Sequence, residues 1–234
     1  VDQLGCRRIL TCATEHSAVL KTARHLGQRD GVNCGMLQLD SDGRVDMDHL
    51  AATLSDGVPT VVSVMHGNNE VGIMQDIEAI GQCCWDHKAL FHSDTVQTMG
   101  HYAMDLGKLP IDFAACSAHK LHGPKGSGLL YVKDGHRISA HIKGGSQERA
   151  MRGGTENLIG IIGLAKALEL SMANMDSHAA HIQGLKAELV EGLKEAVPGI
   201  HFNAGSDRSD SLYTVLNANF PAHEKNGMML FLLD

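Results

Sequence analysis

The sequence predicts an α/β protein in which helices cover both faces of a mostly parallel sheet, followed by part of a smaller α+β domain. Three observations predict this fold. The chain has 234 residues, which is enough for one large doubly wound sheet. Hydrophobic residues make up 43% of it and aromatic residues only 4%, which favours an aliphatic core over a β-sandwich. Short β-branched runs also alternate with segments of helical periodicity.

Residues 1–175 are predicted to form the large domain, in which strands and helices alternate. Thr14 is expected to cap the first helix and Asp46 the second, because each precedes apolar residues at helical spacing. A third helix is expected in "DIEAIGQCCWDH", with Ile77, Ile80 and Cys84 on one face. Strands are expected in "RRILT", "NCGMLQLD", "PTVVSVMH", "ALFHS", "IDFAACS" and "GSGLLYVK".

Residues 176–234 are predicted to begin a smaller C-terminal domain. A long helix over residues 157–175 is expected to end near Asp176, where a second long helix, "AAHIQGLKAELVEGLKEAV", follows. Two short strands are expected in "GIHFNAG" and "SLYTVLNANF", and the last segment, "EKNGMMLFLLD", has the composition of a helix.

Charge and hydropathy exclude two classes of function. The formal net charge is −7 and no segment carries a run of Lys and Arg, so a nucleic-acid surface is not expected. The apolar runs fall short of the roughly 18 to 20 residues that span a bilayer, so no membrane role is expected either. The sequence therefore predicts a cytoplasmic protein.

The six cysteines are expected to be reduced, because they follow neither a disulfide-scaffold spacing nor a C-x-x-C metal pattern. Most lie in apolar segments, where cysteine behaves as a small core residue, so none is predicted to be a nucleophile. His119 and His122 have no second pair of metal-ligating residues to accompany them, and no metal site is predicted.

Polar side chains follow the predicted strands, where a parallel sheet brings its carboxyl ends to one crevice. Lysine and aspartate among them suggest a specific chemistry. A lysine amine forms a Schiff base with a carbonyl, and a carboxylate keeps a pyridine nitrogen protonated, which is the usual contribution of a protein to pyridoxal phosphate chemistry. These side chains belong to His16, Asn69, Asp94, Gln97, Ser117, His119 and Lys120.

Five motifs in this region resemble those of the class V aminotransferases, and the cysteine desulfurases are the group that they resemble most. They cover residues 14 to 157 in the order typical of the family. The resemblance implies a pyridoxal 5'-phosphate-dependent fold type I enzyme. The motifs are "ATEHSAV", "MHGNNEVGIMQDI", "HSDTVQTMG", "SAHKLHGPKGSGLLYVK" and "GGSQERAMRGGTEN".

The resemblance implies a role for each of these residues. Lys120 would bind the cofactor aldehyde as a Schiff base and later act as a base, while His16 would stack on the ring. Asp94 would pair with the pyridine nitrogen, and Gln97 and Asn69 would lie near the phenolic oxygen of the ring.

The phosphate end of the cofactor would be held by other residues. The resemblance implies that Ser117 and His119 hold the phosphate, and that Thr155 reaches the phosphate of a neighbouring subunit. That last role implies a homodimer.

The resemblance also implies a reaction and its partners. L-cysteine would be converted to L-alanine, and the sulfur would pass to an enzyme cysteine as a persulfide and then to an acceptor or scaffold protein for iron-sulfur clusters or thiolation. In the family, an earlier glycine turn binds phosphate, and a later loop carries the sulfur-accepting cysteine and a substrate-binding arginine. Neither segment is found among the present residues, so these residues are expected not to complete desulfuration alone. The sequence also departs from the family at Thr95, because alanine usually follows the aspartate there.

Several alternatives remain open from the residues alone. The enzyme alternatives are a selenocysteine lyase or another class V lyase or aminotransferase, and the alternative of another class is a noncatalytic module that keeps the fold. Lys120 is also compatible with an ordinary surface lysine. Asp94 is compatible with a turn or cap residue, and the glycines after Lys120 with a hairpin between two strands.

Overall fold

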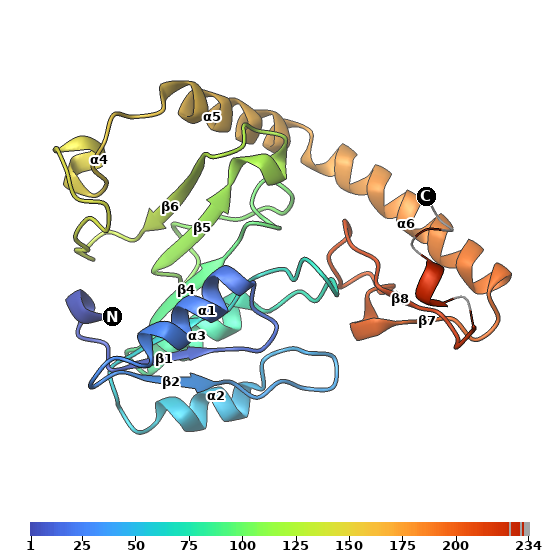
Figure 1. The fold of residues 1–234 in the computed structure, drawn as a ribbon, viewed down its shortest axis with the longest axis horizontal. Coiled ribbons are helices and arrows are strands. Elements are labelled where there is room, and N and C mark those ends of the chain that lie inside the picture. The colour runs from blue at the N-terminus through green and yellow to red at the C-terminus, as the bar shows by residue number, and fades with distance from the viewer. Residues whose placement is uncertain (225, 230, 232–234) are drawn as a thin grey trace.

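A computed structural model describes residues 1–224, 226–229 and 231. Its main feature is a six-stranded sheet with the strand order β2-β1-β3-β4-β5-β6 (Figure 1). The first five strands are parallel and β6 runs antiparallel to β5. The mostly parallel α/β sheet is thus confirmed, and the glycine-rich segment after Lys120 joins two antiparallel strands. The strands are β1 (Arg8–Thr11), β2 (Asn33–Met36), β3 (Thr60–Ser63), β4 (Leu90–Asp94), β5 (Phe113–Ser117) and β6 (Gly128–Val132).

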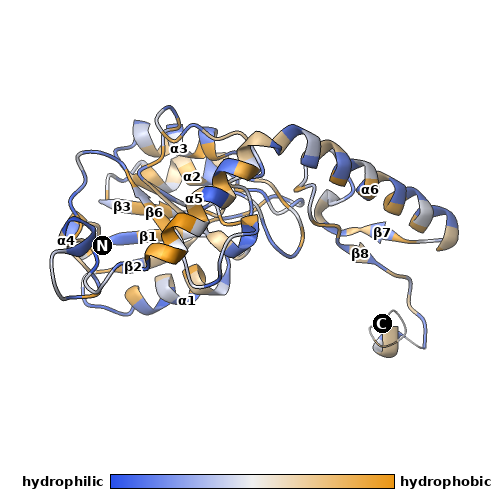
Figure 2. Ribbon diagram, turned by 90° about the horizontal axis from the view of Figure 1, so that it is seen from above, coloured by the Kyte–Doolittle hydropathy of each residue, from blue (hydrophilic) through white to orange (hydrophobic). Residues whose placement is uncertain are grey.

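Helices lie on both faces of this sheet. Figure 2 shows α1 (Ser17–Leu26) on one side of the strands and α2 (Met47–Leu54) with α3 (Ile77–Asp86) on the other. The chain passes from β1 to β2 in one direction across the sheet, and then back past β1 to β3 in the other direction. Because crossovers between parallel strands are right-handed, the helices that connect strands in opposite directions lie on opposite faces. The reversal leaves a switch point between β1 and β3, where ligands of such sheets bind.

The sheet and the α2–α3 layer enclose the main core. Val62 and Phe91 project from neighbouring strands and are fully buried, as is Leu50 on α2. Burying one such side chain stabilises the fold by roughly 1.5–3 kcal/mol. The core therefore holds the strands rigidly and fixes the positions of the loops at their carboxyl ends.

The helix caps agree with the sequence at one position and differ at another. The Asp46 carboxylate accepts a hydrogen bond from the His49 backbone N–H at 2.9 Å, as expected of the α2 cap. The cap of α1 is His16 rather than Thr14. Thr14 lies before the helix, where its carbonyl accepts a hydrogen bond from the Asn68 amide at 2.7 Å. This long-range bond holds Thr14 in the loop, so the helix begins two residues later than the cap prediction implies.

After a short helix, α4 (Gln147–Ala150), two long helices follow the sheet. These are α5 (Leu158–Ala173) and α6 (Met175–Ala196), which are bent by 71° at their junction. The predicted break near residue 176 is therefore a sharp bend. In the described part of the chain, no single helix is long and apolar enough to cross a membrane, and only this bent pair taken together meets the length and composition required.

The last described segments form a small second sheet. Strands β7 (His201–Phe202) and β8 (Ala218–Asn219) pair antiparallel. They are shorter than predicted, because Leu212 lies instead against the loop after β3 and donates its backbone N–H to the Gly72 carbonyl at 2.7 Å. Of the predicted final helix, Asn226–Met228 form a 3-10 turn, while residues 225, 230 and 232–234 lie outside the described residues. The division into domains at residue 175 stays a prediction.

Candidate functional site

Hydrogen bonds join the carboxyl ends of four neighbouring strands. After β1, the Thr14 carbonyl accepts from Asn68, which follows β3. The backbone N–H of His66 donates to the Asp94 carbonyl at 2.9 Å and so links β3 to β4. The His101 imidazole in the loop after β4 donates to the Lys120 carbonyl at 3.0 Å. The predicted site residues therefore project from one cross-linked edge of the sheet.

Asp94 is the last residue of β4 and is half-buried. One of its carboxylate oxygens accepts the Val96 N–H at 3.0 Å, so Asp94 does stabilise a turn, as one alternative proposed. Thr95 is fully buried, and its hydroxyl donates to the Ala115 carbonyl at 2.8 Å. The hydroxyl that replaces the usual alanine methyl thus ties β4 to β5. Gln97 is half-buried in the same turn.

Lys120 lies in a 3-10 turn (Ala118–Leu121) that directly follows β5. Two buried residues of the turn, Ala118 and Leu121, anchor it. The Lys120 side chain itself is exposed, and its amine makes no hydrogen bond or ion pair with other described residues. Next to it, the Ser117 hydroxyl and His119 Nδ1 are 2.8 Å apart. A free amine and a hydroxyl-imidazole pair are thus held on one short turn.

His16 and Asn69 are placed by the loops after β1 and β3. The exposed His16 ring accepts the Ala18 N–H on Nδ1 at 3.2 Å, so its neutral form carries the proton on Nε2. Asn68, rather than Asn69, makes the turn, because its side-chain oxygen accepts the Glu70 and Val71 N–H groups at 2.8 Å each. Asn69 is left with no side-chain hydrogen bond to the described residues.

Thr155 lies apart from these residues. It is exposed in the segment before α5 and lines a cavity of about 610 Å³ together with the start of β6 and Ile161. Lys120 and Asp94 are not part of this lining. The structure therefore does not bring Thr155 to the strand ends of its own chain, and its predicted role toward a neighbouring subunit stays a prediction.

Two titratable residues at the strand ends were missed in the sequence. Glu15 is 7% exposed, and burial first and the Asp94 charge second raise its pKa to about 8. Burial lowers the pKa of His66 to about 4, and its Nδ1 lies 2.9 Å from the Thr98 hydroxyl. His66 directly follows the apolar run of its strand, which is a signal by which it can be found, whereas Glu15 follows Thr14 and has no such signal.

The cysteines are poor nucleophiles where they lie. Burial is the first cause that raises the pKa of all six thiols, so the thiolate form is disfavoured at neutral pH. Among the residues that the structure describes, no three His, Cys, Asp or Glu side chains are grouped to hold a metal ion. The amine, carboxylate and imidazoles of the strand ends are therefore the reactive groups of this edge.

Comparison with known proteins identifies the family. The family model described as "Aminotransferase class-V" matches residues 5–234. The chain belongs to the class V aminotransferase family. This match confirms the resemblance drawn from the five motifs and extends it over the second part of the chain. The roles assigned to single site residues stay predictions.

The chain is similar to cysteine desulfurases in sequence and structure. It is 38% identical over 224 residues to a cysteine desulfurase of Clostridium botulinum, and the match covers 96% of this chain but 56% of that protein. A solved NifS-like protein is 36% identical with a TM-score of 0.87, and 97% of this chain matches 61% of it. SspA, solved in complex with cysteine, is 27% identical with a TM-score of 0.80, and 98% of this chain matches 62% of it.

Proposed function

We propose that this chain is the cofactor-binding part of a pyridoxal 5'-phosphate-dependent cysteine desulfurase. The observation that carries the proposal is the exposed, unpaired amine of Lys120, held on an anchored turn at the same sheet edge as Asp94. An unpaired amine on a rigid turn is suited to bind a carbonyl carbon. The other polar side chains along this edge could contact a bound cofactor, and they support the same proposal.

The residues present fit the chemistry of pyridoxal phosphate. Asp94 supplies a carboxylate for a protonated ring nitrogen, and Lys120 supplies the amine for the aldehyde. The Ser117 hydroxyl and the His119 imidazole lie 2.8 Å apart and supply two donors for a phosphate group. His16 presents an exposed aromatic face after β1. Gln97 and Asn69 add amide donors without partners of their own in the described chain.

In the proposed mechanism the chain's own residues bind, orient and move a proton. Bound pyridoxal phosphate supplies an electron sink for the charge that develops at the substrate α-carbon. Asp94 would hold a proton on the ring nitrogen, which would keep that sink effective. The Lys120 amine would take the α-proton of the substrate and act as the general base. The hydrogen bond from the His101 imidazole to the Lys120 carbonyl would keep the turn in place during this transfer.

Cysteine is the substrate that the relatives support. The Clostridium botulinum relative is a cysteine desulfurase, and SspA was solved with cysteine. We propose that L-cysteine becomes L-alanine and that its sulfur leaves on a cysteine persulfide for an acceptor or scaffold protein in the cytoplasm. We assign this sulfur-accepting role to none of the six present cysteines, because burial disfavours their thiolates.

Reductive trapping tests the proposal. The purified chain is mixed with pyridoxal phosphate and reduced with borohydride, and the modified residue is mapped by mass spectrometry. We expect the label on Lys120, its loss in Lys120→Ala, and its retention in Lys125→Ala, which removes another exposed lysine of the same loop. A folded wild-type chain without label on Lys120 would contradict the proposal. Because these residues are not expected to complete desulfuration alone, the purified chain should release no sulfide from cysteine at an enzyme-like rate, and such a release would contradict the assignment of a cofactor-binding part.

A further inference from the structure

Glu15 is a buried acid that the proposed chemistry does not use. It follows β1 and directly precedes His16, and it is 7% exposed. Neither of its carboxylate oxygens has a hydrogen-bond partner of normal geometry among the described residues. A buried carboxylate without donors is costly, and such a group normally takes up a proton instead.

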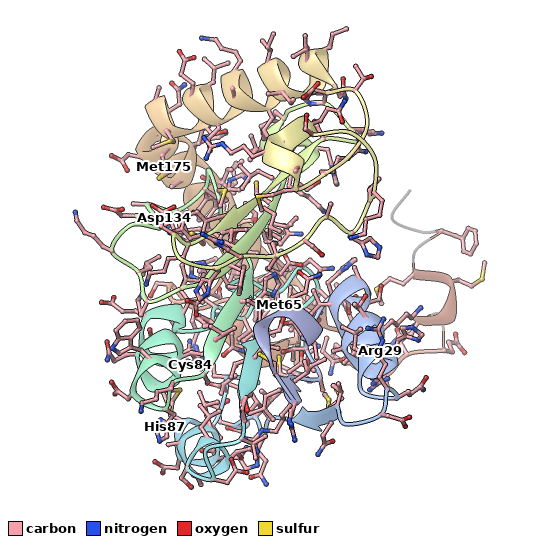
Figure 3. The ribbon with its side chains drawn as sticks, turned by 90° about the vertical axis from the view of Figure 1, so that its left-hand side faces the viewer. Arg29, Met65, Cys84, His87, Asp134 and Met175 are labelled. Atoms are coloured by element: carbon pink, nitrogen blue, oxygen red, sulfur yellow. The ribbon has the colours of Figure 1, made fainter. Side chains whose placement is uncertain are left out.

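The surroundings of Glu15 favour the protonated form. The backbone amides of Met65 and His16 lie near enough to lower its pKa slightly, but burial and the Asp94 charge outweigh them and raise it to about 8. Figure 3 labels Met65, whose backbone interacts with this carboxyl, near the middle of the molecule. Burial is the larger of the two causes, so the proton does not depend on Asp94 alone.

Three further titratable groups interact with Glu15 or Asp94, and none of the three carries a positive charge at pH 7. Cys12 on β1 is buried with its pKa raised by burial, and it interacts with Glu15. Around Asp94, burial lowers the pKa of His92 on β4 and raises that of Cys116 on β5. His92 is therefore neutral at pH 7, and both thiols stay protonated. Asp94 and Glu15 are left to share this end of the sheet.

We propose that Glu15 is a proton-holding positioning residue for Asp94. In the empty site Glu15 is a neutral acid and leaves Asp94 as the charged carboxylate of the pair, and Glu15 can give up its proton when a protonated ring nitrogen binds at Asp94. This inference rests on the proposed function and deepens it, because it names the residue that sets the charge of the cofactor site.

Binding of a cation at Asp94 then couples to the proton on Glu15. The cation offsets the Asp94 charge that helps to hold the proton, so Glu15 releases a proton more easily when the site is filled. Linkage requires that affinity for the cation rises with pH in the range where the empty site still holds this proton. Glu15→Gln is a neutral side chain of the same shape and removes only this coupling.

The first experiment uses the chain without cofactor. The folded pKa of Glu15 lies above its unfolded value of 4.5, so the unfolded state loses the proton first and stability falls as pH rises from about 5 to about 8. The unfolding constant of the wild type should rise about tenfold per pH unit relative to Glu15→Gln. Glu188→Gln, an exposed control on α6, should track the wild type. Asp94→Asn should move the upper end of this range to lower pH.

The second experiment measures pyridoxal phosphate binding between pH 6 and 8 by absorbance. The affinity of the wild type should rise with pH relative to Glu15→Gln, by up to about tenfold per unit. Parallel unfolding curves for the wild type and Glu15→Gln, or a constant affinity ratio, would overturn the role of Glu15 while the proposed function stands. If neither protein binds the cofactor, the proposed function fails and the positioning role fails with it, whatever the unfolding curves show.

Discussion

His66 illustrates how burial changes a single residue at the site edge. Its backbone N–H donates to the Asp94 carbonyl, and its ring packs near Tyr102 with the ring centroids 6.4 Å apart. Desolvation lowers its pKa to about 4, so the ring is neutral at pH 7 and contacts the Thr98 hydroxyl without carrying a charge. A neutral ring adds no cation beside Asp94, which leaves that carboxylate available.

The titration of His66 predicts a loss of stability in acid. The unfolded state binds a proton below the ordinary pKa of 6.5, whereas the folded state binds it only near 4. Stability should therefore rise with pH from about 4 to 6.5, and lowering the pH from 6.5 to 5 should cost about 2 kcal/mol through His66. Denaturant unfolding of His66→Asn should lack this contribution, and the exposed control His178→Asn should keep it. Equal slopes for His66→Asn and the wild type would contradict the assignment.

At the scale of the element, α3 shows how a helix is fitted to the sheet. Ile77, Ile80 and Cys84 are all buried, as their spacing predicts, and Asp76 caps the helix by accepting the Ala79 N–H at 2.9 Å. Gly81 lies on the buried side as well, where a Cβ atom would be 2.3 Å from the Pro110 carbonyl oxygen. The helix therefore approaches the turn before β5 as closely as glycine permits.

Gly81 and Gly184 both lie within helices, but replacing each with alanine should change stability in opposite directions. Gly81→Ala should destabilise the protein by about 1–3 kcal/mol, because backbone of the Pro110 turn must move to admit the methyl group. Gly184→Ala on α6 should stabilise it by up to about 1 kcal/mol, because nothing lies within 4 Å and alanine favours a helix. Thermal or denaturant unfolding measures both. A stabilising Gly81→Ala would show that the helix is not tightly packed there.

At the scale of the whole molecule, an apolar surface accompanies the cavity that Thr155 lines. Ile159 is 85% exposed and Ile162 is 67% exposed on α5, and Leu130 on β6 is 53% exposed. Figure 2 shows α5 as one of the most hydrophobic helices of the molecule. Large apolar side chains that are this exposed are typical of an interface. Its place beside Thr155 supports the homodimer that the family resemblance implies.

The predicted homodimer can be tested by the mass of the protein in solution and by a substitution that should disrupt it. Light scattering of the purified chain should report two copies, and Ile159→Asp should shift the mass to one copy because a charge at the centre of an apolar interface is costly to bury. Val58→Asp, which places the same charge on an exposed apolar residue of the loop before β3, should leave the dimer intact. A monomeric wild type would refute this surface as the dimer interface.

The strand and helix pattern, the parallel sheet and the polar strand ends were all predictable from the sequence. Periodicity and β-branched runs depend on neighbours along the chain, and the five motifs place Asp94 and Lys120 at successive strand ends. Asp46 and the buried face of α3 follow from the same local rules. For these features, contacts within a few residues are enough to decide the structure.

The tertiary structure alone decided the features that depend on long-range contacts. Thr14 is a residue type that commonly caps helices, but its carbonyl bonds to Asn68, 54 residues away in sequence, and holds it in the loop. His16 caps the helix instead. Glu15 and His66 have ordinary side chains whose pKa values change only because other segments remove water from them. A sequence determines which groups a chain carries, whereas desolvation and neighbouring charge, which set what those groups do, arise only once distant segments pack together.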